Sequence, residues 1–193
     1  MVISKSYRQK SRTGKSVYAP GPAAEEIESH ILAVLVRNEP GVLARVIGLF
    51  SGRGYNIDSL TVAETDHIAN MSRITVVCSG TPQVITQIKA QLGRMVSVQS
   101  VRDLTTYGPH VERELALVKV SGQDDKRIEA LRTADIFRAS VVDSTLDSFT
   151  FEITGTVDKI DAFLDLMRPL GLIDVSRTGI AAISRGPTAI GED

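Results

Sequence analysis

Apolar residues recur along the first half of the chain with two different spacings. Short continuous or alternating runs, typical of strands, cover residues 30–38, 56–66, 71–80 and 96–106. Between them, two stretches place apolar residues three or four positions apart, as on one face of a helix. These positions are Val42, Leu43, Val46, Ile47 and Phe50 in the first stretch and Val84, Ile85, Ile88 and Leu92 in the second. The order strand–helix–strand–strand–helix–strand is the split βαβ, or ferredoxin-like, arrangement.

The same order of elements is predicted again in the C-terminal half. Strands are expected at 114–122, 138–147, 148–156 and 172–185, and helices at 124–137 and 157–171. In the third of these strands, Phe149, Phe151 and Ile153 alternate with polar residues, which is the spacing of a half-buried strand. The sequence therefore predicts an α+β fold of two tandem ferredoxin-like (βαββαβ) domains.

Polar and charged segments set the expected domain boundaries. Residues 1–27 form a basic leader that is expected to be disordered, because residues 1–22 hold five Lys or Arg residues and no acid. An organellar transit peptide is one interpretation of this leader, but a solvated extension is favoured because no amphipathic helix pattern is visible. The expected order is then a first domain at 28–107, a linker at 108–113, a second domain at 114–186 and a tail at 187–193.

Composition adds exclusions to this picture. The formal net charge of −1 gives no electrostatic case for binding a nucleic acid or an anionic membrane. No apolar stretch approaches the ~20 residues of a membrane span. The single cysteine, Cys78, excludes an internal disulfide or a cysteine-based zinc site, and it is expected to be a buried thiol. A cytoplasmic protein fits best, with a plastid as the alternative if the leader is a transit peptide.

Residue patterns for catalysis are missing from the sequence. There is no Walker-type phosphate loop, no GxGxxG after a strand, and no HExxH, CxxC or GxSxG motif. His30, His67 and His110 lie in different segments without metal-like spacing, and each is expected to be a surface or turn residue. No pair of acids stands out for general acid–base work. We therefore expect no catalytic and no metal-binding residues, and a binding site instead.

The best candidate for a binding site is the junction from strand to helix at Arg37–Leu43. The first N–H groups of a helix have no intrahelical partners and, with the helix dipole, favour an anion. Gly41 allows close approach of a ligand to the backbone, Pro40 stiffens the turn, and Asn38 offers a donor and an acceptor. A carboxylate on the N–H groups of Gly41, Val42 and Leu43 is one reading, and a plain capped turn is the other.

Several longer segments carry a family resemblance. NEPGVLARVIGLFSGRGYNIDSLTV (38–62) and MSRITVV (71–77) resemble the amino-acid-binding ACT domain of the acetolactate (acetohydroxyacid) synthase small subunit. The second half of that subunit is similar to segments 110–115, 136–143, 161–171 and 179–186. The RGYNI-x-SLTV block and the HVERE junction are specific to this family, whereas ACT domains in general share only a loose D/N-x-P-G-x-L core.

The resemblance implies a regulatory subunit that activates a separate catalytic subunit and makes it sensitive to feedback inhibition, usually by valine. It implies no cofactor in this chain, since the catalytic partner carries thiamine diphosphate, Mg²⁺ and FAD. It also implies a homodimer in which ACT domains pair side by side with the ligand at the seam. Residues from both subunits would then form the effector site, with Asn38, Pro40, Gly41, Val42 and Leu43 from one subunit meeting Asn56 and Ile57 of the other.

Two other classes of function compete with this one. RNA-recognition domains share the element order but carry stacking aromatics on their central strands, and the runs 30–38 and 71–78 contain none. An ACT regulator of another amino-acid-metabolism enzyme is the second alternative, and the HVERE-like junction and the second repeat argue against it.

Overall fold

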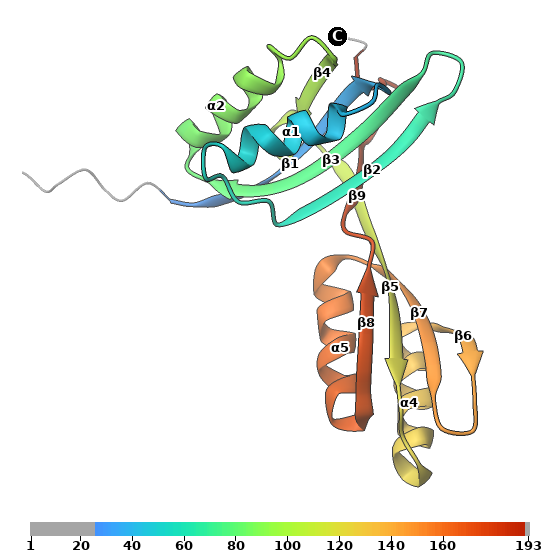
Figure 1. The fold of residues 1–193 in the computed structure, drawn as a ribbon. Helices are drawn as coiled ribbons and strands as arrows, with labels where there is room; N and C mark the ends of the chain where they lie inside the picture. Colours follow the sequence, from blue (N-terminus) through green and yellow to red (C-terminus); the bar gives the residue numbers. More distant parts are fainter. Residues whose placement is uncertain (1–25, 192–193) are drawn as a thin grey trace, which may run out of the picture.

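The computed structural model describes residues 26–191, and it contains two antiparallel β-sheets, one in each half of the chain (Figure 1). In each half, two helices cover one face of the sheet. The predicted α+β fold of two ferredoxin-like units is therefore confirmed. The predicted leader lies outside the described residues except for its last two positions. Among residues 26–191, no helix is long and apolar enough to cross a membrane.

The N-terminal half follows the predicted order of elements. They are β1 (Glu28–Arg37), α1 (Val42–Ser51), β2 (Ser59–Asp66), β3 (Met71–Gly80), α2 (Pro82–Leu92) and β4 (Val98–Asp103). The strands lie in the order β2-β3-β1-β4. Leu32, Val34 and Val36 alternate along β1 and pack with Val46 and Phe50 of α1 in the first core. This packing fixes which face of the sheet the helices cover.

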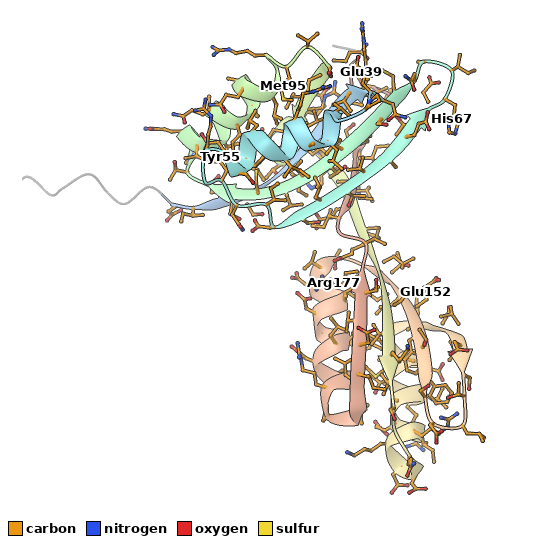
Figure 2. The ribbon with its side chains drawn as sticks, in the orientation of Figure 1. Glu39, Tyr55, His67, Met95, Glu152 and Arg177 are labelled. Atoms are coloured by element: carbon orange, nitrogen blue, oxygen red, sulfur yellow. The ribbon has the colours of Figure 1, made fainter. Side chains whose placement is uncertain are left out.

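The C-terminal half repeats the arrangement with different side chains. Its elements are α3 (Leu104–Tyr107), β5 (His110–Val120), α4 (Asp124–Phe137), β6 (Ser140–Ser144), β7 (Phe149–Gly155), α5 (Val157–Gly171), β8 (Leu172–Arg177) and β9 (Ala181–Ser184). The main path of this sheet is β6-β7-β5-β8. Phe151 of β7 meets Phe163 of α5 edge to face in the second core. Figure 2 shows the side chains of both halves.

The join between the halves differs from the expected linker at 108–113. Residues His110–Arg113 already belong to β5, and they pair antiparallel with β9. The strand expected at 172–185 is divided into β8 and β9, because Gly179 has a positive φ of 80° and turns the chain there. The chain thus crosses between the two sheets twice, once in β5 and once between β8 and β9 (Figure 1).

The segment around β9 covers the face of the N-terminal sheet that the helices leave open. Ile180 and Ala182 pack there against Ile31 and Ala33 of β1 and Val77 of β3, with Leu104 completing a third apolar cluster. The segment expected as a tail at 187–193 continues this contact, since its Ala189 carbonyl accepts a hydrogen bond from the Arg102 guanidinium at 3.1 Å. Residues from the far end of the second domain therefore stabilise the first.

Two expectations about single residues in β1 and β3 have opposite outcomes. Cys78 is fully buried, as predicted. The expectation of a surface or turn position for His30 is wrong, because His30 is 5% exposed and its Nδ1 lies 3.0 Å from Oδ2 of Asp103. Asp103 lies at the end of β4, far from His30 in the sequence, so no local sequence pattern predicts this contact.

Candidate functional site

The predicted binding loop joins the end of β1 to the start of α1. Its first residue is held by Asn70, because the Asn38 N–H donates to the Asn70 carbonyl at 2.8 Å and the Asn70 amide donates to the Asn38 carbonyl at 3.2 Å. Gly41 is the N-cap of α1 and has a φ of 79°, in the left-handed region that favours glycine. Pro40 restricts the preceding position. The loop is therefore anchored at its base, and residues 38–41 at its tip are exposed.

The N–H groups at this helix end are only partly occupied. Val42 N–H donates to the Glu39 carbonyl at 3.1 Å, and its side chain is buried in the core. The N–H groups of Gly41 and Leu43 have no acceptor among residues 26–191. A Cβ built on Gly41 would meet nothing within 4 Å among the same residues. Within the described part of the chain, two of the three expected donors thus remain available for an anion, and the third is already used.

A small polar cluster, which the sequence did not predict, lies beside the loop. The Glu39 carboxylate accepts hydrogen bonds from the Ser97 hydroxyl at 3.1 Å and from the Arg45 guanidinium at 3.3 Å. Arg45 also donates to the Ser97 hydroxyl at 2.9 Å. These contacts hold the Glu39 carboxylate in place and pair its negative charge with the Arg45 guanidinium beside the helix end. Ser97 comes from the segment before β4, so no spacing in the sequence signals the cluster.

Asn56 and Ile57 lie beyond the other end of α1. The Asn56 amide donates to Oδ1 of Asp58, whose Oδ2 accepts from the Ser79 hydroxyl at 2.7 Å. Ile57 is half-buried against the first core. A helix of ten residues is about 15 Å long, and Figure 2 shows Glu39 and Tyr55 at its opposite ends. One chain therefore does not bring the two predicted halves of the site together.

Strand β2 has a free edge next to both halves of the site. It begins just after Ile57, and its far end leads into the turn that contains Asn70. In the described part of the chain it pairs with β3 alone. Val62 in its middle is 42% exposed. Such an edge offers unpaired backbone groups to the strand of a second chain.

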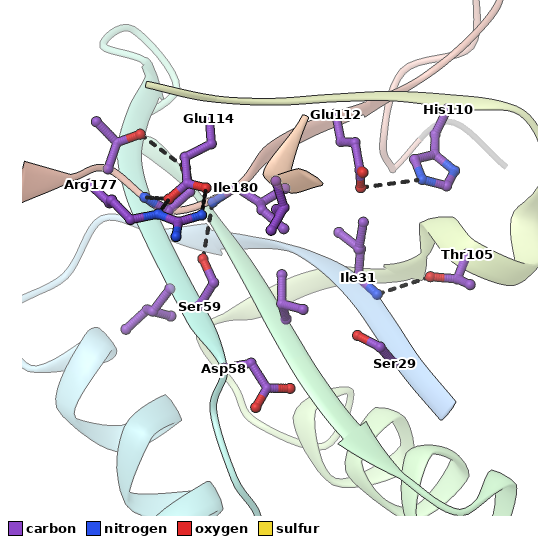
Figure 3. Close-up of a pocket in the computed structure, with 15 residues that line it drawn as sticks. Ser29, Ile31, Asp58, Ser59, Thr105, His110, Glu112, Glu114, Arg177 and Ile180 are labelled. Carbon is purple, nitrogen blue, oxygen red and sulfur yellow. Dashed lines mark hydrogen bonds and ion pairs between the residues drawn. The ribbon is translucent and has the colours of Figure 1, made fainter. Parts of the chain in front are cut away.

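A cavity with a volume of about 860 Å³ lies between the two halves of the chain (Figure 3). Its Glu114 carboxylate is buried, and the Arg177 guanidinium donates to both of its oxygens at 2.9 and 2.6 Å. Arg177 also donates to Asp161 at 2.7 Å. The bonds to Glu114 and Asp161 raise the pKa of Arg177 above its usual value. The ionic groups at this wall are thus engaged with each other, and all three belong to the C-terminal half.

The remaining candidates for chemistry are the Cys78 thiol and the side chains that could bind a metal ion. Burial, and then the negative charges of Asp58 and Asp103, raise the pKa of the Cys78 thiol to about 11. The thiol is therefore protonated at neutral pH and enclosed in the core. Among residues 26–191, no group of three or more His, Cys, Asp or Glu side chains is arranged to hold a metal ion.

A ferredoxin-like unit with an open, glycine-capped helix end and a free edge strand is the architecture of an ACT domain, a small regulatory module. The family comparisons give the same class. Residues 32–100 match the family described as "AHAS small subunit-like ACT domain", and residues 113–186 match "Small subunit of acetolactate synthase". The chain belongs to the acetolactate synthase small-subunit family, and it is a regulatory subunit whose partner is the catalytic subunit of that enzyme.

Curated relatives and a solved structure are similar over most of the chain. The acetolactate synthase small subunit of Aquifex aeolicus is 47% identical over 161 residues, which are 83% of both chains. The isozyme 3 small subunit of Escherichia coli is 46% identical over 81% of this chain and 95% of that one. The crystal structure of the small subunit from Thermotoga maritima superposes with a TM-score of 0.76 at 35% identity, covering 83% of this chain and 99% of that chain.

The environment of Cys78 leads to a first prediction. At pH 8 a thiol with a pKa near 11 is about one part in a thousand thiolate, and burial blocks access as well. We expect a chromogenic thiol reagent to leave the native protein unmodified at pH 8 and to label one thiol per chain in guanidinium. Labelling of the native protein should grow only as the pH approaches 11.

The matched control is the double variant Cys78→Ser, Ser79→Cys. It moves the thiol one position along β3 to the opposite, half-exposed face, where native labelling should be rapid. Rapid labelling of the unaltered native protein at pH 8 would contradict the assignment of Cys78 as an inert core residue.

Proposed function

We propose that the Asn38–Leu43 loop binds the carboxylate of a branched-chain amino acid, with valine as the first choice, and that this binding produces feedback inhibition. The observation that carries the proposal is the helix end at Gly41, which has open space and two N–H groups without an acceptor among residues 26–191. A carboxylate there gains hydrogen bonds and the favourable field of α1. The half-buried Leu43 supplies an apolar wall beside it.

The second half of the site is assigned to the neighbouring subunit of a dimer. The Asn56 side-chain oxygen and the Asp58 carboxylate beside it suit the ammonium group of an amino acid. Ile57 of the same segment adds an apolar contact for the aliphatic side chain. The carboxylate and the ammonium group of the amino acid, which are both attached to its α-carbon, would thus be held by different subunits.

The free edge of β2 supports a dimer of this kind. A two-fold axis would pair β2 of one chain antiparallel with β2 of the other. The start of β2, next to Asn56, would then lie beside the end of the other β2, next to the turn that holds Asn38. The pairing therefore brings together the two half-sites that α1 separates within one chain.

The subunit itself is proposed to perform no chemistry. Thiamine diphosphate, Mg²⁺ and FAD are assigned to the catalytic partner, and regulation is assigned to this chain. A ligand that bridges two subunits binds one relative arrangement of them more tightly than another, and only this difference in affinity shifts the activity of the partner. Effector couplings of about 1–3 kcal/mol are typical, so partial inhibition is expected.

Reconstitution tests the proposal directly. We expect the chain, added to its purified catalytic subunit, to raise the rate of acetolactate formation, and valine to lower that rate again. Leucine and isoleucine titrations in the same assay rank the effectors. If the rate neither rises with the chain nor falls with any branched-chain amino acid, both activation and feedback are disproved.

Gly41→Asp is the sharpest single substitution at the loop. Asp tolerates the left-handed conformation better than most residues, and its side chain enters open space, so the fold should survive. Its carboxylate would repel the effector carboxylate, and the valine concentration for half-maximal inhibition should rise at least about tenfold, which corresponds to ~1.4 kcal/mol. Gly41→Asn, with the same shape and no charge, is the control and should have a clearly smaller effect. Unchanged valine sensitivity in Gly41→Asp would mean that the carboxylate binds elsewhere.

Mixed dimers test whether the site spans two subunits. A dimer of one Gly41→Asp chain and one Asn56→Ala chain has one site with both changes and one site with neither. Random exchange of subunits makes about half of the dimers mixed, so mixing the two insensitive variants should restore about a quarter of all valine-binding sites, measured by calorimetry. A site contained in one chain would gain nothing from mixing, since each chain keeps its own defect.

A further inference from the structure

The segment Thr178–Ile180, which joins β8 to β9, runs across the start of β2. The Ile180 N–H donates to the Ser59 hydroxyl at 3.0 Å, and the Thr61 hydroxyl donates to the Thr178 carbonyl at 3.3 Å. The approach is close, because a Cβ on Gly179 would lie 2.6 Å from the Ser59 oxygen. Figure 3 shows Ser59 and Ile180 meeting at one wall of the cavity between the domains.

The same segment is bonded to the second domain. The Thr178 N–H donates to the Leu115 carbonyl at 3.0 Å, and the Leu115 N–H donates to the Thr178 hydroxyl at 3.2 Å. The Gly179 N–H donates to Glu114 at 3.2 Å, and Glu114 is itself held by Arg177. The segment therefore moves with β5 and β8 of the second domain, while its other side is held by β2.

Ser59 is also close in the chain to half of the effector site. Asn56 donates to Asp58, and the Asp58 N–H donates to the Val77 carbonyl at 2.8 Å, so the segment that enters β2 is ordered from Asn56 onward. An effector ammonium bound to the Asn56 oxygen and the Asp58 carboxylate, as proposed above, contacts the residue directly before Ser59. The cavity of about 860 Å³ beside Asp58 and Ser59 leaves room for the two domains to shift relative to each other.

We propose that the contact between Ser59 and the segment Thr178–Ile180 is the joint through which effector binding at the ACT dimer changes the position of the second domain. Ser59 is then a positioning residue, since it touches neither the effector nor the reacting atoms. This inference rests on the proposed function, because it needs an effector at Asn56. It adds a definite path between two sites, which coupling measurements on single side chains can test.

Ser59→Ala is the test variant, used as the full-length chain with its catalytic subunit. It removes the acceptor for the Ile180 N–H and leaves the fold-determining core untouched. We expect activation of the catalytic subunit and calorimetric valine binding to stay within about twofold of the unaltered chain. The maximal inhibition at saturating valine should fall, because occupied sites then no longer shift the activity of the catalytic subunit.

Two further variants separate this role from a loss of structure. Ser59→Thr keeps the hydroxyl and should restore normal inhibition. Thr65→Ala removes a hydroxyl on the same face of β2, but this hydroxyl donates to the Met71 carbonyl and not to the joint. Valine should inhibit this variant as it inhibits the unaltered chain. Normal inhibition of Ser59→Ala overturns the inference, and so does a loss of valine binding in that variant, since Ser59 would then belong to the binding site.

The proposed function fails in a distinguishable way. If the unaltered chain neither binds valine nor confers inhibition, the effector site is disproved and the joint with it. If valine inhibits both the unaltered chain and Ser59→Ala normally, the effector site stands and the joint alone is disproved.

Discussion

The structure depends on how the open face of the N-terminal sheet is covered. An antiparallel sheet has two faces, and α1 and α2 bury only one of them. Ile180 and Ala182, near the end of the chain, bury the other face against Ile31 and Ala33. The Arg73 guanidinium fixes this cover by donating to the Ala182 carbonyl at 2.7 Å. Because the covering residues come from the far end of the second domain, the position of each domain depends on the other.

Two arginines that stabilise this arrangement, Arg73 and Arg177, have shifted pKa values. Burial under the covering segment, and then the charge of Arg102, lower the pKa of Arg73 from its usual value. The guanidinium remains charged at any physiological pH, so its bond to the covering segment persists there. At the join, the buried Glu114 carboxylate is likewise held by Arg177. Removing Glu114 or Arg177 would leave the other charge without its partner, and the low-dielectric interior stabilises such a charge poorly.

The candidate site shows the opposite design, a helix end whose donors are left free. Like α2, α4 and α5, helix α1 begins without a side-chain hydrogen bond to its first N–H groups, and its N-cap Gly41 also has a left-handed backbone with open space beside it. Leaving donors unsatisfied costs stability unless water or a ligand occupies them. The ordered Asn38–Asn70 contact at the base of the loop keeps the exposed tip in one shape. A binding site that is preformed in this way requires little reorganisation when an anion arrives.

The sequence by itself determined the elements and the turn chemistry. Periods of 2 and 3.6 predict the repeated βαββαβ order, and the Pro40-Gly41 pair marks the turn, because these signals arise between neighbours in the chain. Tertiary structure alone decided which residues meet across long separations. It joined His30 to Asp103 and Glu39 to Ser97, and it placed Asn56 a helix length from Gly41. It also divided the last predicted strand, since only the packing of both domains shows that β9 belongs against the first sheet. Contacts of this kind depend on how sheets and helices pack, and no local pattern records them.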